Sequence, residues 1–209
     1  MTQYLVYVPI FLIGYLLGSS NMAWYLSKLR GIDLSAGGTG NPGASNTVIL
    51  MGWKAGVLVG IHDIGKAILA VWLCGRLFPG VAFCGAVAGV ACVIGHMFPF
   101  YLRFRGGKGF ASYLGMVFAL DWRFALVLCA AVLILTLLTD YIVVGTMTTV
   151  ISFPIYCAVI GSTTVALLLC VLSGIIIFKH RANLVRICRG TEIGFRSAGR
   201  GDHRVNKKQ

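Results

Sequence analysis

Long apolar runs constrain this sequence more than any other feature. A helix needs about 20 residues to cross the hydrocarbon core of a bilayer. Seven runs approach or exceed that length, at about residues 4–26, 55–78, 80–97, 110–120, 123–138, 142–160 and 163–178. The run at 110–120 is short, so we expect a broken or tilted half-span there. Only 11% of the residues are charged and the mean hydropathy is +0.87, which indicates an integral membrane protein.

The positions of the cations predict how these spans are oriented. Cytoplasmic loops are enriched in Lys and Arg, and Lys28 and Arg30 directly follow the first run. The sequence therefore predicts an all-α polytopic membrane protein with seven transmembrane helices, its N-terminus outside and its C-terminus cytoplasmic. We expect residues 1–209 to form a single domain, with cytoplasmic loops at about 27–54, 98–109 and 179–192 and a basic tail at 193–209.

Composition disfavours several functions. The net charge of +12 could suggest nucleic-acid binding, but the 18 Lys and Arg residues lie in loops and a tail, so we expect anionic lipid or phosphorylated substrates and no nucleic acid. Six of the seven cysteines lie inside apolar runs, and none forms a C-x-x-C pair. We therefore expect them to pack as small hydrophobes. Six Asp and Glu residues are too few to suggest a metal, and no cofactor is expected.

The stretch 95–109 combines glycines with cations between two apolar runs. Its three cations are Arg103, Arg105 and Lys108. Gly106 and Gly107 would let backbone N–H groups turn toward an anion and approach it closely. This composition is typical of phosphate binding. The alternative is that the cations are cytoplasmic anchors and the glycines only turn the chain.

The first cytoplasmic loop contains a second glycine-rich stretch, at 33–46. Gly38, Gly40 and Gly43 satisfy the G-x-G-x-x-G pattern, but no strand precedes them, so a dinucleotide site is not expected. Small polar side chains there would make a neutral, donor-rich cradle for a phosphate. They are Thr39, Asn41, Ser45 and Asn46. The alternative is a flexible surface loop.

Two further segments carry polar residues at informative spacings. Asp63 and Lys66 lie inside the second run, where charges are costly enough to indicate function. The alternative is a pair in which each neutralises the other and braces the loops. His180 and Asn183 are spaced i and i+3, so one helix face can present both to a common site. The alternative there is a basic amphipathic helix on the membrane surface.

Three motif regions together resemble one family. The middle region is the most specific, and its matching residues are His96, Phe98, Pro99, Phe104, Gly106, Gly107, Lys108 and Gly109. The last region matches at His180, Asn183, Arg186 and Glu192. The first includes Gly18, Ser19, 38–46 and 63–66. In these regions, in length and in expected topology, the chain resembles the bacterial acyl-phosphate:glycerol-3-phosphate acyltransferases, the PlsY family.

The resemblance implies an enzyme of the bacterial inner or plasma membrane whose active site faces the cytoplasm. It would transfer a fatty acyl group from acyl phosphate to the 1-hydroxyl of glycerol 3-phosphate, giving lysophosphatidic acid and phosphate in the first step of phospholipid synthesis. The substrate's own phosphate would act as base, with no covalent acyl-enzyme, no cofactor and no obligate protein partner.

The resemblance also implies roles for individual residues. The implied catalytic residues are Lys108, His180 and Asn183. The implied substrate-binding residues are Ser19, Gly38, Thr39, Gly40, Asn41, Gly43, Ser45, Asn46, Asp63, Lys66, His96, Gly106, Gly107 and Glu192. No metal ligand is implied.

The chain departs from the family pattern at several positions. Ser35 and Ile49 stand where arginines are usual, and Asp140 stands where an Arg is often found. Ile142 and Val143 replace a pair that contains serine. One lost cationic hydrogen bond to a buried phosphate would cost roughly 1.5 to 3 kcal/mol. One alternative is therefore a related transferase with another phosphorylated acceptor. A second alternative, suggested by Asp63 and Lys66 inside the membrane, is a small anion transporter. The transporter is disfavoured because the sequence shows no internal repeat.

Overall fold

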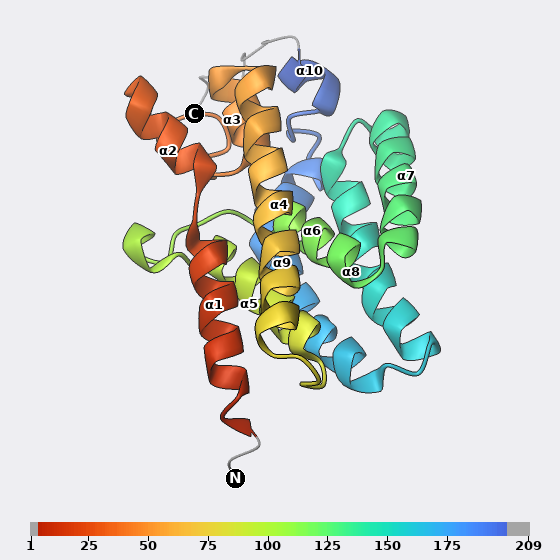
Figure 1. Ribbon diagram of the computed structural model, residues 1–209. Coiled ribbons are helices and arrows are strands. Elements are labelled where there is room, and N and C mark those ends of the chain that lie inside the picture. Colours follow the sequence, from red (N-terminus) through yellow and green to blue (C-terminus); the bar gives the residue numbers. More distant parts are fainter. Residues whose placement is uncertain (1–3, 200–209) are drawn as a thin grey trace.

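The computed structural model describes residues 4–199, and the regular elements in that part of the chain are helices. In chain order they are α1 (Tyr7–Ser19), α2 (Met22–Arg30), α3 (Ala44–Met51), α4 (Trp53–Leu77), α5 (Cys84–Met97), the 3₁₀ helix η2 (Phe100–Leu102), α6 (Phe110–Leu120), α7 (Trp122–Thr139), α8 (Ile142–Val159), α9 (Thr163–Cys188) and α10 (Phe195–Gly199). Figure 1 shows the longer helices in a bundle, with α2, α3 and α10 at the end opposite the amino terminus. Of the predicted basic tail at 193–209, residues 193–199 are described and the rest lies outside the described residues.

Helices of membrane-spanning length confirm the all-α polytopic prediction. Among the described residues, five helices are long and apolar enough to cross a membrane: α4, α5 with its extension through η2, α7, α8 and α9. The predicted half-span is present as α6, which has 11 residues. α1 has 13 residues and is also short. The count of seven crossings and the orientation of the termini stay predictions.

The first apolar run is not one continuous helix, so the expectation of a single span over 4–26 is wrong. α1 ends at Ser19 and α2 begins at Met22, and between them Asn21 is extended (φ −128°, ψ 98°). The Asn21 side chain accepts a hydrogen bond from the Trp24 N–H at 2.9 Å. A polar residue that caps the next helix in this way is the local cause of the break.

The predicted loop at 27–54 also contains regular structure. α2 continues to Arg30, and α3 occupies Ala44–Met51. Gly52 (φ 84°) separates α3 from α4 in a backbone region that favours glycine. α3 packs against α4 beyond this corner, so the second half of the loop is held on the bundle.

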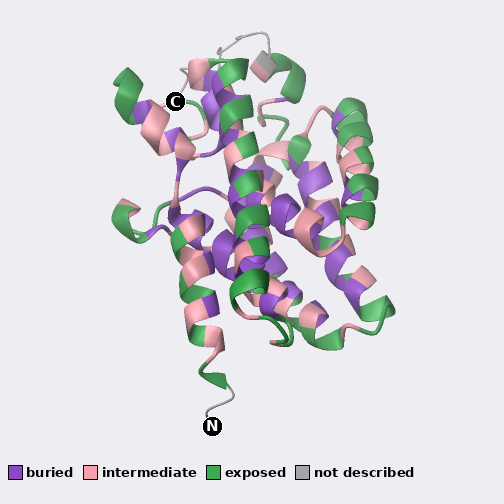
Figure 2. Cartoon of the chain, viewed as in Figure 1, coloured by how far each residue is buried: buried purple, intermediate pink, exposed green. Residues whose placement is uncertain are grey.

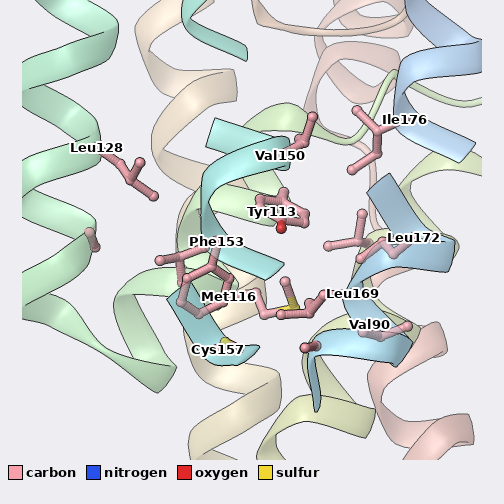
Figure 3. Packing of buried hydrophobic residues seen from close by; sticks show 14 of the residues in the cluster. Val90, Tyr113, Met116, Leu128, Val150, Phe153, Cys157, Leu169, Leu172 and Ile176 are labelled. Carbon is pink, nitrogen blue, oxygen red and sulfur yellow. The ribbon is translucent and has the colours of Figure 1, made fainter. Parts of the chain in front are cut away.

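The main hydrophobic core lies between α5, α6, α8 and α9. Tyr113 of α6, Phe153 of α8 and Leu169 of α9 are among its fully buried side chains (Figure 3). Buried residues concentrate where these helices meet, and exposed residues follow the outer face of α7 (Figure 2). Exposed Leu126 and Leu133 on that face suit contact with lipid.

Small residues let α1 and α5 approach closely, as is common between membrane helices. A Cβ on Gly14 or Gly18 would collide with the α5 backbone. The cysteines are free, and four of them are buried as expected for small hydrophobes: Cys74, Cys84, Cys92 and Cys157. Cys129 is half-buried, and Cys170 and Cys188 are exposed, so the expectation holds for only part of the set.

Candidate active site

A cavity of about 310 Å³ lies between the first loop, α3, α4, α6, α8, α9 and the segment after α9. Residues from all three motif regions line it. They include Thr39, Asn41, Gly43, Ser45, Asp63, His96, Lys108, His180, Asn183 and Glu192. The fold therefore brings most of the sequence-predicted site residues to one place.

Lys108, Asn183 and Glu192 form a continuous chain of hydrogen bonds at the cavity wall. Lys108 Nζ donates to Asn183 Oδ1 at 2.5 Å, and Asn183 Nδ2 donates to Glu192 Oε1 at 2.5 Å. The second carboxylate oxygen of Glu192 accepts from Arg186 Nε at 2.6 Å. Charge-assisted bonds of this kind fix orientation. The Lys108 ammonium keeps two further N–H donors for an anion.

The environment of Lys108 changes its acidity. Burial lowers the pKa of Lys108 to about 8, and the positive charge of Arg186 acts in the same direction. A lysine with this pKa is mostly charged at pH 7. Because burial has removed part of its hydration, the ammonium would gain from an anion bound beside it.

His180 and Asn183 share one face of α9, as their spacing predicts, and both are buried. His180 Nδ1 lies 2.9 Å from the Ile176 backbone carbonyl. Because a carbonyl oxygen only accepts, Nδ1 carries the hydrogen of the neutral ring and Nε2 is left as an acceptor. His180 can thus accept a hydrogen bond from a hydroxyl in the cavity. The burial of both side chains contradicts the alternative of a helix lying on the membrane surface.

Gly106 and Gly107 shape the Lys108 loop and are not among the residues that line the cavity. Their N–H groups donate to the Met97 and His96 carbonyls, at 3.1 Å each. The expectation that these N–H groups bind an anion is therefore wrong, because they already have partners. A Cβ on Gly107 would collide with the His96 imidazole, so glycine lets the loop pack on the end of α5.

The predicted phosphate cradle divides into lining and bracing residues. Thr39, Asn41, Gly43 and Ser45 line the cavity. Asn46 is fully buried, where its Oδ1 accepts from the Thr39 N–H at 2.7 Å and its Nδ2 donates to the Leu34 carbonyl at 2.9 Å. Gly38 and Gly40 have positive φ, and a Cβ on Gly38 would collide with the Asn46 side chain. Gly38, Gly40 and Asn46 are not among the residues that line the cavity and instead set the shape of the cradle.

Asp63, Lys66 and His96 form a buried charge cluster between α4 and α5. Lys66 Nζ lies 2.8 Å from Asp63 Oδ1 and 2.9 Å from His96 Nδ1, and it donates to the Ser20 carbonyl at 2.7 Å. Its three donors are thereby used, and Lys66 is not among the cavity-lining residues. Lys66 ties the break between α1 and α2 to the bundle, in line with the structural alternative for this pair. Ser19 likewise stays away from the cavity, because its hydroxyl bonds to a carbonyl one turn earlier in α1.

One wall of the cavity comes from residues that the sequence does not mark. Phe195, Ile193 and Ala198 line it from the segment after α9, and Trp53 lines it from the start of α4. The predicted basic tail begins in this segment, and its composition suggests an exposed chain. No local periodicity or motif indicates that it returns to the site.

The departures from the family pattern fall in two groups. Ser35 is exposed, and its hydroxyl donates to Asp33 at 2.7 Å. This bond contributes most to holding the pKa of Asp33 below its usual value. Ile49, Ile142 and Val143 instead line the cavity. Apolar side chains therefore stand in the wall itself, whereas Ser35 lies outside it.

A cavity that joins cationic and hydrogen-bonding groups to apolar walls, within a bundle of membrane helices, suits a membrane enzyme whose substrates have both anionic and apolar parts. The sequence model of the glycerol-3-phosphate acyltransferase family matches residues 8–190. The chain belongs to this family, which confirms the resemblance found in the three motif regions.

Relatives and solved structures agree with this membership. The chain is 38% identical over 188 residues to glycerol-3-phosphate acyltransferase 1 of Oceanobacillus iheyensis, covering 87% of this chain and 91% of that protein. It is 37% identical over 184 residues to the glycerol-3-phosphate acyltransferase of Thermoanaerobacter pseudethanolicus, covering 87% and 91%. The glycerol 3-phosphate form of PlsY (YgiH), an integral membrane glycerol 3-phosphate acyltransferase, matches with a TM-score of 0.85 at 33% identity, covering 91% of this chain and 96% of that one. Its lysophosphatidic acid form matches with a TM-score of 0.81 at 32% identity, covering 92% and 97%.

Proposed function

We propose that this chain transfers a fatty acyl group from acyl phosphate to the 1-hydroxyl of glycerol 3-phosphate, giving lysophosphatidic acid and phosphate. The main support is the chain of hydrogen bonds from Lys108 through Asn183 to Glu192 at the wall of a partly apolar cavity. The related PlsY structures are a glycerol 3-phosphate form and a lysophosphatidic acid form. These two compounds are the acceptor and the product of the proposed reaction.

The reaction needs alignment more than a protein nucleophile. Acyl phosphate is a mixed anhydride and is already activated. The acceptor hydroxyl oxygen attacks the acyl carbonyl carbon, a carbon–oxygen ester bond forms, and phosphate departs with the electron pair of the broken bond. The hydroxyl proton passes to a phosphate oxygen. No covalent acyl-enzyme is required, and the protein contributes positioning and charge stabilisation.

The cavity groups divide this work. Lys108 binds the phosphate of glycerol 3-phosphate through its two remaining donors. His180 Nε2 accepts a hydrogen bond from the 2-hydroxyl of glycerol 3-phosphate, which orients the attacking 1-hydroxyl and leaves its proton free to pass to phosphate. Asn183 holds Lys108 in place. Glu192 supports Asn183 from the other side. The geometry that supports these roles is the convergence of the four side chains on one cavity.

The donor phosphate is proposed to bind at the amino-terminal end of α3. Thr39, Asn41 and Gly43 line the cavity before this helix, and Ser45 lines it in the first turn. The first N–H groups of a helix have no partner within the helix, and they favour a bound anion.

We also propose seven crossings in a bacterial inner or plasma membrane, with the N-terminus outside, the C-terminus and the site on the cytoplasmic side, and residues 1–209 as one domain. Exposed cations support this orientation, because Lys28, Arg30, Arg103 and Arg105 fall in the loops assigned to the cytoplasm. Arg76 lies in the last turn of α4 and Arg123 in the first turn of α7. In the proposed topology both helix ends face the outside. α1 and α6 would complete the count as short crossings.

Phosphate release from palmitoyl phosphate tests the function. The detergent-purified protein is assayed with and without glycerol 3-phosphate, and the lipid product is identified by mass spectrometry. We expect release that depends on the acceptor, together with lysophosphatidic acid. Lys108→Ala should abolish it and the exposed Lys54→Ala should not. Folded protein without acceptor-dependent release would contradict the proposal.

A different phosphorylated acceptor is the second candidate. Ile49, Ile142 and Val143 in the cavity wall favour it, because they offer an acceptor no polar side-chain group. A panel of phosphorylated alcohols, each in competition with glycerol 3-phosphate, separates the two. A better substrate that shares the Lys108 dependence would replace glycerol 3-phosphate in the proposal.

A further inference from the structure

The chain beyond α9 forms a wall of the cavity, and we call residues 190–199 the C-terminal strap. Gly190 (φ 67°) turns the chain at the end of α9. Glu192, Gly194 and Phe195 then line the cavity. α10 lies beside α3 at this end of the molecule (Figure 1). The strap is therefore a packed part of the site.

Asp140, in the turn between α7 and α8, holds the strap through several contacts. Its backbone carbonyl accepts from the Phe195 N–H at 2.7 Å, and its Oδ1 accepts from the Arg196 N–H at 2.9 Å. Arg196 Nε also lies 4.0 Å from the same carboxylate oxygen, and Arg196 Nη2 donates to the Leu137 carbonyl at 2.7 Å. Gly194 approaches so closely that a Cβ there would collide with the Asp140 carboxylate.

The strap joins this turn to the other side of the cavity and to the catalytic groups. The Phe195 ring meets Trp53 of α4 edge-on, with ring centroids 5.3 Å apart. Glu192 accepts a hydrogen bond from Asn183, which in turn accepts from Lys108. Arg186 of α9 also holds Glu192, so a displaced strap would shift the Glu192 carboxylate relative to Asn183 and loosen the Lys108 ammonium.

The contacts at Asp140 are suited to opening. The side chains of Arg196 and Asp140 are 60% and 30% exposed, so water and salt screen their ion pair and it contributes little. At Asp140, the two backbone N–H bonds therefore contribute more to holding the strap than this ion pair does. Such a strap can release to admit substrate and then close behind it, as active-site loops do.

We infer that Asp140 is a positioning residue for acyl transfer: it latches the C-terminal strap across the cavity and so keeps Glu192 on Asn183. The inference rests on the proposed function. Asp140 acts through the strap and not on the substrate. Its removal should therefore slow turnover in proportion to the loss of strap closure.

Asp140→Gly and Asp140→Asn form the test pair. Asp140 has a φ of 68°, which glycine adopts without strain and asparagine tolerates. Glycine removes the carboxylate, and asparagine keeps the Oδ1 acceptor. We expect D140G to lower kcat about tenfold, because it removes a hydrogen bond to a charged carboxylate, and D140N to stay within about threefold of wild type. R196A should resemble D140N, and R189A, which removes an exposed cation before the strap, should match wild type.

Trypsin cleavage after Arg196, followed by mass spectrometry, reports strap position in the full chain without substrate or turnover. We expect D140G to be cut there about fivefold faster than wild type or D140N, because cleavage tracks the open population. Equal cleavage rates, or a lower kcat without faster cleavage, would overturn the latch. A wild type without acceptor-dependent phosphate release would instead overturn the proposed function, while the cleavage rates still decide the latch.

Discussion

Raising the pH from 7 to 9 is expected to lower kcat/KM for glycerol 3-phosphate about tenfold. The pKa of Lys108 is lowered to about 8, first by burial and then by Arg186. At that value the ammonium is about nine-tenths charged at pH 7 and about one-tenth charged at pH 9. A neutral amine cannot hold a dianionic phosphate. A lysine with its ordinary pKa would stay mostly charged over this range. A loss of kcat/KM between pH 7 and 9 would therefore show that burial lowers the pKa of Lys108.

The assay is the initial rate of phosphate release at low glycerol 3-phosphate, at half-unit steps from pH 7 to 9.5. Under these conditions kcat/KM reports groups of the free enzyme. Ionisation of the acceptor phosphate contributes little, because its second pKa is near 6. Lys108→Arg keeps its charge at every pH, so we expect a lower but level profile. Lys54→Arg, on an exposed lysine, should keep the wild-type decline.

Two results would refute this reasoning. A wild-type profile that stays level between pH 7 and 9 would mean that the charge of Lys108 does not limit acceptor binding. A Lys108→Arg profile that declines like wild type would assign the titration to another group. Thermal unfolding of each variant across the same pH range separates loss of the site from loss of the fold.

Other substitutions test the remaining roles. His180→Ala should lower kcat about a hundredfold by removing the acceptor that orients the hydroxyl, with unchanged thermal unfolding; a loss of expression alone would indicate a structural role. Gly107→Ala should abolish activity because its Cβ collides with His96, whereas Gly75→Ala, at an exposed helical glycine with open space around it, should be neutral in the same assay. Ser35→Arg should leave KM for glycerol 3-phosphate within about twofold, because Ser35 lies outside the cavity; a KM that drops tenfold would show that the first loop reaches the phosphate.

Periodicity and residue type are enough to predict several parts of this site. The spacing of His180 and Asn183 places them on one face of α9, since helical geometry alone decides that. The apolar run before Asp121 predicts α6, because its residue types favour a membrane helix and its length sets the length of that helix. The convergence of three separate motifs follows from the family resemblance, because no local pattern in the sequence brings Lys108 to Asn183.

Hydrogen-bond partners explain most of what could not be predicted. The sequence suggests that the N–H groups of Gly106 and Gly107 are free to bind an anion. In the structure they donate to backbone carbonyls at the end of α5. Asn46 reads as a ligand, but two backbone groups of its own loop use its amide. The role of Asp140 depends on a strap more than 50 residues later. Such pairings are set by tertiary packing, which local composition does not encode.

The length of α6 has a consequence for how the substrates meet. Eleven residues span about 16 Å, roughly half of the hydrocarbon thickness. The cavity lies at the amino-terminal end of this helix, where Phe110, Ala111 and Leu114 line it. In the proposed topology, the deepest part of the cavity therefore lies toward the middle of the bilayer. A water-soluble acceptor would descend to the acyl chain, and the product would leave sideways into the same leaflet without turning over.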